Sequence, residues 1–294
     1  MKEPLHPGRM ARPGGTGDRQ PNGYAAPAER YGFEIRKIEE LLSRRIGVGG
    51  LRIYYQPMFE VSTDGIFGAE ALLRWVITRG EAVHYEDLTP LQEDLALSSA
   101  LDLWVLEQAC LDARRWGVGK PRLPLVFVNL SDSILREAGD LERQVQSVLQ
   151  RSGLEGYRLG LEISERAVVS PTGSCAATLQ RLRDLGTSVV LDDFGTGYSS
   201  LSRLSALPTD YLKLDKSFMA SLGATGSRGE AVIEAVTRLA HLLGTRVVAE
   251  GIENPRQLRK VRQAGCDLAQ GYYLSTPLRA EEFTRLISEA STGS

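Results

Sequence analysis

The chain has 294 residues, of which 42% are hydrophobic, and carries a formal net charge of −2 with a pI near 6.0. This length allows one large hydrophobic core, and the near-neutral charge argues against a DNA or RNA polymer as partner. The sequence has no run of about 18–20 apolar residues for a membrane span and no signal-peptide core. Three isolated cysteines predict reduced thiols and a cytoplasmic location, as a free protein or as the cytoplasmic part of a longer, membrane-attached one.

The first 30 residues differ in composition from the rest of the chain. They contain five prolines and five glycines, with almost no aromatic or β-branched residues. Such a composition cannot bury enough apolar surface to form a core. We therefore expect a disordered tail or linker over residues 1–30 and a single domain over residues 31–294.

From Leu51 onward, short apolar runs alternate with amphipathic stretches of helical period. Strands are expected at 51–56, 66–74, 125–130, 158–163, 188–192, 211–214, 246–250 and 267–270. Helices are expected between them, for example at 91–116, 139–151, 174–185, 229–243, 254–264 and 279–290. Repeated strand–helix alternation predicts an α/β protein with a mainly parallel sheet, and eight strands fit a TIM-like (β/α)8 barrel. The first two strands are joined by a turn around Thr63-Asp64-Gly65, so the first strand is expected to run antiparallel.

Polar side chains fall on one face of these strands, close to their C-terminal ends. They are Glu70, Asn129, Glu162, Asp192, Asp193, Lys213, Glu250 and Gln270. Because the alternate residues are apolar and can pack on outer helices, the polar groups are expected to face the barrel interior. Active sites of TIM barrels lie at this end of the strands.

The five acidic side chains of this group cannot all ionise together unless cations neutralise them. Oxygen ligands without Cys or His favour Mg²⁺ or Mn²⁺ over zinc. The adjacent Asp192 and Asp193 could supply a carboxylate that bridges two ions, as two-metal phosphoryl-transfer sites require. The residues alone therefore indicate a hard-metal site that is suited to phosphate esters.

Several short motifs follow one another over residues of about 35–290. They are Tyr55-Gln56-Pro57, Glu70-Ala71-Leu72-Leu73-Arg74-Trp75, Val128-Asn129-Leu130-Ser131, Leu161-Glu162-Ile163-Ser164-Glu165, Asp192-Asp193-Phe194-Gly195-Thr196-Gly197-Tyr198-Ser199, Lys213-Leu214-Asp215, Ala249-Glu250-Gly251-Ile252-Glu253 and Gln270-Gly271-Tyr272. In this order and spacing they resemble the EAL domains, a family of bacterial cyclic di-GMP phosphodiesterases. The match is specific because it consists of many motifs, whereas one Glu-Ala-Leu triplet would indicate nothing.

The resemblance implies metal-dependent hydrolysis of cyclic di-GMP to linear 5′-pGpG by in-line attack of a metal-activated water. The implied metal ligands, for two ions bridged by Asp192, are Glu70, Asn129, Glu162, Asp192, Asp193 and Glu250. The implied catalytic residues are Lys213, beside the water, with Glu70, Asp192 and Glu250. The implied substrate contacts are Gln56, Leu72, Arg74, Gln270 and Pro277. The resemblance also implies a mobile loop at Asp193–Gly197, although an ordinary strand–helix turn would show the same glycine-rich pattern. Glu165 and Glu253 match acidic residues that fix this loop or support the residues that bind the metal.

The family resemblance further implies a homodimer, and a sensory or cyclase domain in a longer parent protein. Departures from the family pattern put regulation or dimer contacts in doubt more than catalysis. They are Ser164 in place of a common Thr, the absence of His-Pro within 76–85, the divergent Thr89–Glu93 and Leu274 in place of a frequent Phe.

Two other functions stay open on the sequence. The first is a catalytically inactive receptor that binds cyclic di-GMP without hydrolysing it. The second is a Schiff-base aldolase that uses Lys213, although neighbouring carboxylates would keep that lysine protonated.

Overall fold

The structure is a computed structural model that describes residues 50–76, 82–84, 95–116, 123–136, 140–168, 175–196, 205–220, 222 and 228–290. Several sequence-based expectations lie outside the described residues. They are the tail at 1–30, most of the segment 76–85, the divergent Thr89–Glu93 and the end of the loop at Gly197.

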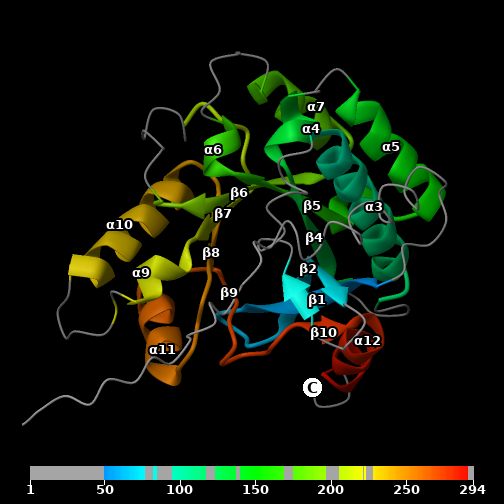
Figure 1. The fold of residues 1–294 in the computed structure, drawn as a ribbon. Coiled ribbons are helices and arrows are strands. Elements are labelled where there is room, and N and C mark those ends of the chain that lie inside the picture. Colours follow the sequence, from blue (N-terminus) through cyan, green and yellow to red (C-terminus); the bar gives the residue numbers. More distant parts are fainter. Residues whose placement is uncertain are drawn as a thin grey trace, which may run out of the picture.

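Eight of the described strands close into a ring (Figure 1). In the order in which they pair, these strands are β1 (Leu51–Glu60), β2 (Ile66–Val76), β4 (Leu125–Leu130), β5 (Leu159–Ser164), β6 (Ser188–Phe194), β7 (Tyr211–Leu214), β8 (Arg246–Ala249) and β9 (Leu268–Ala269). Strand β1 runs antiparallel to both β2 and β9, and the other neighbours in the ring pair in parallel. The predicted TIM-like barrel and its antiparallel first strand are both confirmed.

Two short strands outside the ring were not expected from the sequence. Strand β3 (Ala82–His84) pairs with the end of β2, and β10 (Leu278–Arg279) pairs with β1. Runs of two or three residues are too short to show a two-residue hydrophobic period. Both strands extend the sheet beside the β1–β2 hairpin.

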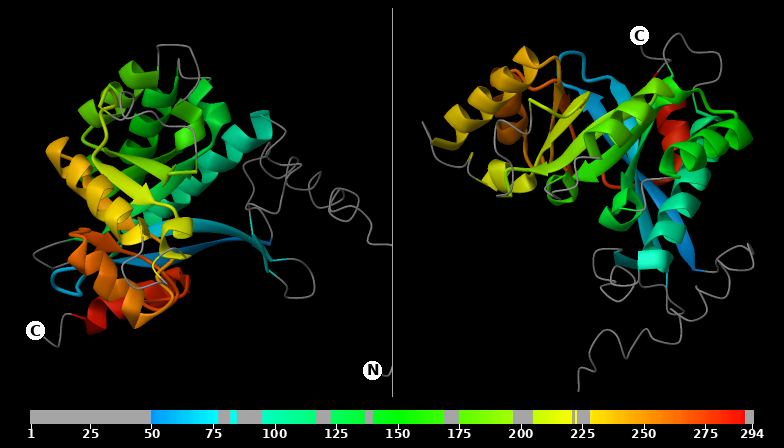
Figure 2. Two further views of the ribbon diagram at one scale, coloured as in Figure 1. Left: turned by 90° about the vertical axis from the view of Figure 1, so that its left-hand side faces the viewer. Right: turned by 90° about the horizontal axis from the view of Figure 1, so that it is seen from above.

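The helices lie on the outside of the ring, as the views in Figure 2 show. The described helices are α3 (Leu95–Ala113), α4 (Asp132–Arg136), α5 (Leu141–Ser152), α6 (Glu165–Val168), α7 (Cys175–Asp184), α9 (Lys216–Ala220), α10 (Arg228–Leu242), α11 (Pro255–Gln263) and α12 (Ala280–Glu289), with a 3₁₀ turn η2 (Gly156–Arg158). The expected helices agree with these within a few residues, except that the start of the 91–116 stretch lies outside the described residues. Across the described chain, no helix is both long enough and apolar enough to cross a bilayer.

Alternation along the strands separates an outer core from an apolar layer inside the ring. The inner layer consists of Met58, Phe67, Leu125, Phe127, Val190, Tyr211, Val248 and Leu268. Gly160 leaves room for one of these rings, because a Cβ at this position would lie 2.4 Å from Phe127 Cδ1. The guanidinium of Arg246 lies 4.8 Å from the centre of the Phe67 ring. This packed layer fills the barrel below the polar residues and closes it to water from that side.

The outer face of β1 is held by aromatic packing against α3 and α12. The buried ring of Tyr55 meets Trp116 edge-on at 4.9 Å and stacks at 6.3 Å on Phe283. Its hydroxyl donates a hydrogen bond of 2.7 Å to Asp112 of α3. Because neighbouring residues of a strand face opposite ways, anchoring Tyr55 outward directs Gln56 to the barrel interior.

Candidate active site

The polar residues singled out in the sequence converge at the C-terminal ends of the parallel strands. Glu70, Glu162, Asp192 and Lys213 belong to β2, β5, β6 and β7, while Glu250 and Gln270 directly follow β8 and β9. Their side chains point inward because the residues beside them in sequence, such as Leu161 and Leu212, pack in the outer core. The group sits directly above the apolar inner layer.

Lys213 lies at the centre of this group, with only 1% of its surface exposed. Its Nζ lies 2.8 Å from Glu250 Oε1, 2.9 Å from Glu162 Oε2, 3.2 Å from Glu70 Oε2 and 3.3 Å from Asp192 Oδ1. Burial by itself lowers the pKa of this ammonium, but the four carboxylates outweigh burial and raise the pKa well above its usual value. The lysine is therefore charged, whereas a Schiff-base nucleophile must be neutral. This environment argues against the aldolase alternative.

Glu70 is held as a carboxylate by three donors. Asn129 Nδ2 donates to Oε1 at 2.8 Å, and Gln270 Nε2 donates to Oε2 at 2.9 Å, beside the Lys213 contact. Burial raises the pKa of Glu70, but the charge of Lys213 and these hydrogen bonds more than offset burial, so that the pKa lies below its usual value. The side chain is fixed and ionised.

The other carboxyl groups around Lys213 have raised pKa values. For Glu162 the causes are burial first and then the charge of Glu70. For Asp192, burial and the charges of Glu70 and Asp193 outweigh the lowering effect of Lys213. Burial, only partly offset by Lys213, raises the pKa of Glu250 to about 8. One ammonium does not neutralise four carboxylates, so these groups retain protons unless further cations enter.

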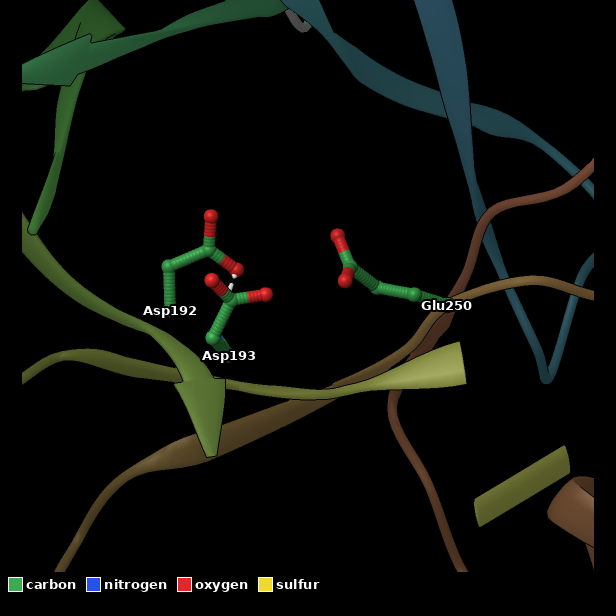
Figure 3. A group of neighbouring side chains, drawn as sticks. All are labelled: Asp192, Asp193 and Glu250. Carbon is green, nitrogen blue, oxygen red and sulfur yellow. Dashed lines mark hydrogen bonds between the residues drawn. The ribbon is translucent and has the colours of Figure 1, made fainter. Parts of the chain in front are cut away.

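The carboxylates of Asp192, Asp193 and Glu250 could hold such a cation. Figure 3 shows the first two reaching from β6 toward Glu250, which points at them from the opposite side, and each of the three offers an oxygen within 4.8 Å of the others. Asp193 has φ of +56°, a left-handed conformation that is uncommon for a residue other than glycine. This conformation interrupts the strand alternation, so that two consecutive aspartates face the same space.

Two buried oxygens close to this cluster also lack a partner. Glu162 Oε1 and Gln270 Oε1 accept no hydrogen bond in the described part of the chain. Buried acceptors are normally satisfied, and a set of carboxylate and amide oxygens without Cys or His suits Mg²⁺ or Mn²⁺. The residues present therefore fit the divalent cations expected from the sequence.

The loop after β6 is tied down by a buried glutamate. Glu165 is 2% exposed, and its Oε2 accepts a hydrogen bond of 2.9 Å from the backbone N–H of Gly195. Gly195 has φ of +103°, and a Cβ there would lie 2.2 Å from Phe218 Cε2. Glu253 is exposed, and its backbone N–H donates a hydrogen bond of 2.8 Å to Gln257 Oε1; its expected role at this loop stays a prediction.

The expected substrate contacts lie around the mouth above the acidic centre. Gln56 stands opposite Glu70 in the β1–β2 ladder, and Leu72 and Arg74 follow on the same face. Gln270 is 3% exposed, and the half-buried Pro277 directly precedes β10. The structure thus brings the members of this set to one end of the barrel.

Two features near the site were missed in the sequence. Tyr54 stands opposite Leu72 in the β1–β2 ladder and lies on the same strand face as Gln56; its two-residue spacing from Gln56 was the available signal. Asp102 of α3 is buried and accepts hydrogen bonds from the backbone N–H and the hydroxyl of Ser131 at 2.8 and 2.5 Å. It thereby fixes the turn that follows Asn129. No local pattern in α3 distinguishes such an aspartate from an exposed one.

Comparison with known proteins agrees with this geometry. The sequence matches the EAL domain family over residues 39–277, and the chain belongs to that family. It is 36% identical over 252 residues to the cyclic di-GMP phosphodiesterase NbdA of Pseudomonas aeruginosa, covering 85% of this chain and 32% of NbdA. It is 35% identical over 241 residues to the oxygen sensor protein DosP of Escherichia coli, covering 82% of this chain and 30% of DosP.

A solved structure, the PaMucR phosphodiesterase in complex with c-di-GMP, superposes with a TM-score of 0.77 at 32% identity. The superposition covers 85% of this chain and 99% of that one. The chain spans about a third of the length of the curated relatives it matches. The EAL fold of this chain thus corresponds to one domain of those larger proteins.

Proposed function

We propose that this protein hydrolyses cyclic di-GMP to linear 5′-pGpG in a reaction that depends on Mg²⁺ or Mn²⁺. The observation that carries the proposal is the set of four carboxylates around the buried ammonium of Lys213, at distances of 2.8–3.3 Å. These closely spaced carboxyl groups, together with the unpartnered oxygens of Glu162 and Gln270 beside them, offer the oxygen ligands that divalent cations prefer, and such cations assist hydrolysis of a phosphodiester.

The residues that would hold the metal ions are Glu70, Asn129, Glu162, Asp192, Asp193 and Glu250. Ions held there would neutralise charge on the phosphate and lower the pKa of a water. In the overall reaction the P–O3′ bond breaks in line with the attacking water, whose oxygen stays on phosphorus while one of its protons ends on the 3′ oxygen. The amide groups of Asn129 and Gln270 hold Glu70 in place throughout.

Lys213 contributes as a hydrogen-bond donor. In the metal-free protein the surrounding carboxylates raise its pKa and favour the charged form. At the centre of the cluster it limits repulsion among the acids and can donate a hydrogen bond to the attacking water. The apolar layer beneath closes the site from the other end of the barrel.

The alternative function is a receptor that binds cyclic di-GMP without hydrolysis. Each residue of the expected metal set, and Lys213 with it, is retained in this chain. Nucleotide binding alone does not need a buried acidic cluster in which the pKa values of Glu162 and Glu250 are raised. The enzyme is therefore the function that we propose.

The decisive experiment follows conversion of cyclic di-GMP to pGpG with Mg²⁺, with Mn²⁺ and with a chelator. We expect turnover with either metal and none with the chelator. The Glu70→Ala variant, checked for folding by its melting temperature, should lose activity by several orders of magnitude. Binding of the nucleotide without turnover in saturating metal would establish the receptor instead, and equal substrate loss with wild type and variant would refute the assignment.

We further propose a cytoplasmic domain over residues 31–294 that acts as a homodimer within a longer sensory or cyclase protein, with residues 1–30 as a linker. The name of DosP, an oxygen sensor, and the short span of this chain on its relatives support a modular arrangement. Sedimentation equilibrium of the chain tests the dimer, and limited proteolysis near residue 30 tests the linker.

A further inference from the structure

The inner face of the β1–β2 hairpin carries three successive cross-strand pairs. From the acidic centre outward, these pairs are Gln56–Glu70, Tyr54–Leu72 and Arg52–Arg74. Directly opposite residues of an antiparallel ladder lie on the same side of the sheet. The one register shift of this ladder lies below them, between Met58 and Phe59. Met58 continues the same face into the apolar layer, so all three pairs face the barrel interior and its mouth.

The outermost pair places two positively charged side chains opposite each other, Arg52 and Arg74. Arg52 is exposed and donates from Nη1 to the neighbouring Leu51 carbonyl at 2.8 Å, and Arg74 donates likewise to Leu73 at 3.0 Å. Neither guanidinium forms an ion pair with a carboxylate in the part of the chain that the structure describes. Like charges directly opposite each other destabilise a sheet. Repulsion between the two guanidinium groups therefore costs free energy in the ligand-free protein. An anion bound between the two side chains would relieve this repulsion.

We propose that Arg52 acts with Arg74 to bind the phosphodiester group that is not being hydrolysed, which makes Arg52 a specificity-determining residue. This inference rests on the proposed function, because it assumes a substrate with two phosphodiester groups in one ring. One group occupies the acidic centre with its cations, and the second must lie elsewhere in the mouth. Guanidinium groups bind phosphate oxygens in a planar, two-pronged geometry.

The spacing along the hairpin suits such a ligand. With a strand rise of about 3.3 Å per residue, Arg74 lies roughly 13 Å along the strand from Glu70, and a long flexible side chain can reach back over part of that distance. The intervening pair, Tyr54 and Leu72, is half-buried and offers apolar surface to a base or sugar. The positive charges of Arg52 and Arg74 at the mouth also counteract the repulsion that the acidic centre exerts on an anionic substrate.

The test compares wild type with Arg52→Gln, Arg52→Lys and a matched surface control, Arg143→Gln. Arg143 lies on α5, one of the helices outside the ring, with 80% of its side chain exposed. Equilibrium binding is measured by calorimetry for cyclic di-GMP and for linear GpG, which has a single phosphodiester group, and KM and kcat are measured for hydrolysis. Melting temperatures report on folding.

We expect Arg52→Gln to weaken binding of cyclic di-GMP and to raise KM by about tenfold, the effect of one charge-assisted hydrogen bond. The affinity for GpG and kcat should stay within about twofold of wild type, and the melting temperature within about 2 °C. Arg52→Lys should recover part of the loss, since it keeps the charge but not the planar fork. Unchanged binding in Arg52→Gln, or equal losses for both ligands, would overturn the inference, whereas absence of turnover in wild type would refute only the proposed function.

Discussion

Lowering the pH from 8.5 to 6.5 should weaken Mg²⁺ binding by about 25-fold, because the Glu250 carboxyl must lose a proton before it can hold a cation. Burial raises the pKa of this carboxyl to about 8. A pH of 6.5 lies 1.5 units below that pKa, so most Glu250 carboxyl groups are protonated. Removing this proton on metal binding then costs about 2 kcal/mol more than at pH 8.5. Protons on Glu162 and Asp192, whose pKa values are also raised, make the dependence steeper.

The same shift determines how the metal-free protein responds to pH. A carboxyl group whose pKa rises from 4.5 to about 8 on folding binds more protons in the folded than in the unfolded state between those values. Its contribution to stability is complete below pH 4.5 and is lost as the pH rises through 8. Because a bound cation takes the place of the proton, Mg²⁺ should raise the melting temperature more at pH 8.5 than at pH 6.5.

Calorimetric titration of Mg²⁺ at four pH values between 6.5 and 8.5, in two buffers of different ionisation enthalpy, gives both the affinity and the number of protons released. The Glu250→Gln variant is the matched control, since it keeps the size of the side chain and removes the titrating group. It should bind Mg²⁺ more weakly with a shallower pH dependence. Affinities that agree within threefold across this range, or an identical dependence in the variant, would refute the reasoning.

Two further predictions concern residues that support the site. Burial raises the pKa of Asp102 from 3.8 to about 7, so its contribution to stability is lost as the pH rises through 7. Relative to Asp102→Asn, wild type should lose about 3 kcal/mol in free energy of unfolding between pH 5 and 8.5, measured by urea denaturation; a difference that stays constant with pH would contradict this. Gly195→Ala combines φ of +103° with a Cβ 2.2 Å from Phe218, and it should destabilise the fold by about 3 kcal/mol and reduce the Mg²⁺ response. Gly244→Ala, with φ of +77° and no atom within 4 Å, should cost only about 1 kcal/mol and leave that response intact; equal effects of the two variants would exclude a role for the Phe218 contact.

The strands of the ring were predictable because most of them are covered by helices on one side and filled from within on the other. Such strands appear as short, continuous apolar runs, and the expected 125–130 and 211–214 coincide with β4 and β7. The antiparallel first strand was predictable from the short turn at Asp64, which leaves no room for a crossover helix. Strands β3 and β10 were not predictable, since their pairing partners rather than their own residues hold them extended.

The candidate site also has some features that were predictable from the sequence and others that were not. Two-residue alternation determines on which face of its strand each polar side chain lies, and this identified Glu70, Glu162 and Lys213 from local pattern alone. The left-handed backbone of Asp193 breaks this alternation, and neighbouring residues did not indicate it. The hydrogen bonds by which Asp102 fixes the turn after Asn129 were not predicted either. Asp102 and Ser131 meet only when α3 packs beside β4.

The amino-acid sequence by itself thus determined the kind of site at this barrel mouth: acidic, free of Cys and His ligands, and centred on one lysine. It did so because composition and strand phase are local properties. Only the tertiary structure decided the distances and the ionisation. Lys213 meets Glu70 at a separation of 143 residues along the chain, and the pKa of Glu250 depends on burial and on charges from three other strands. The opposition of Arg52 and Arg74 likewise arises only from the register of the hairpin, because which residues stand opposite each other is set when the two strands pair.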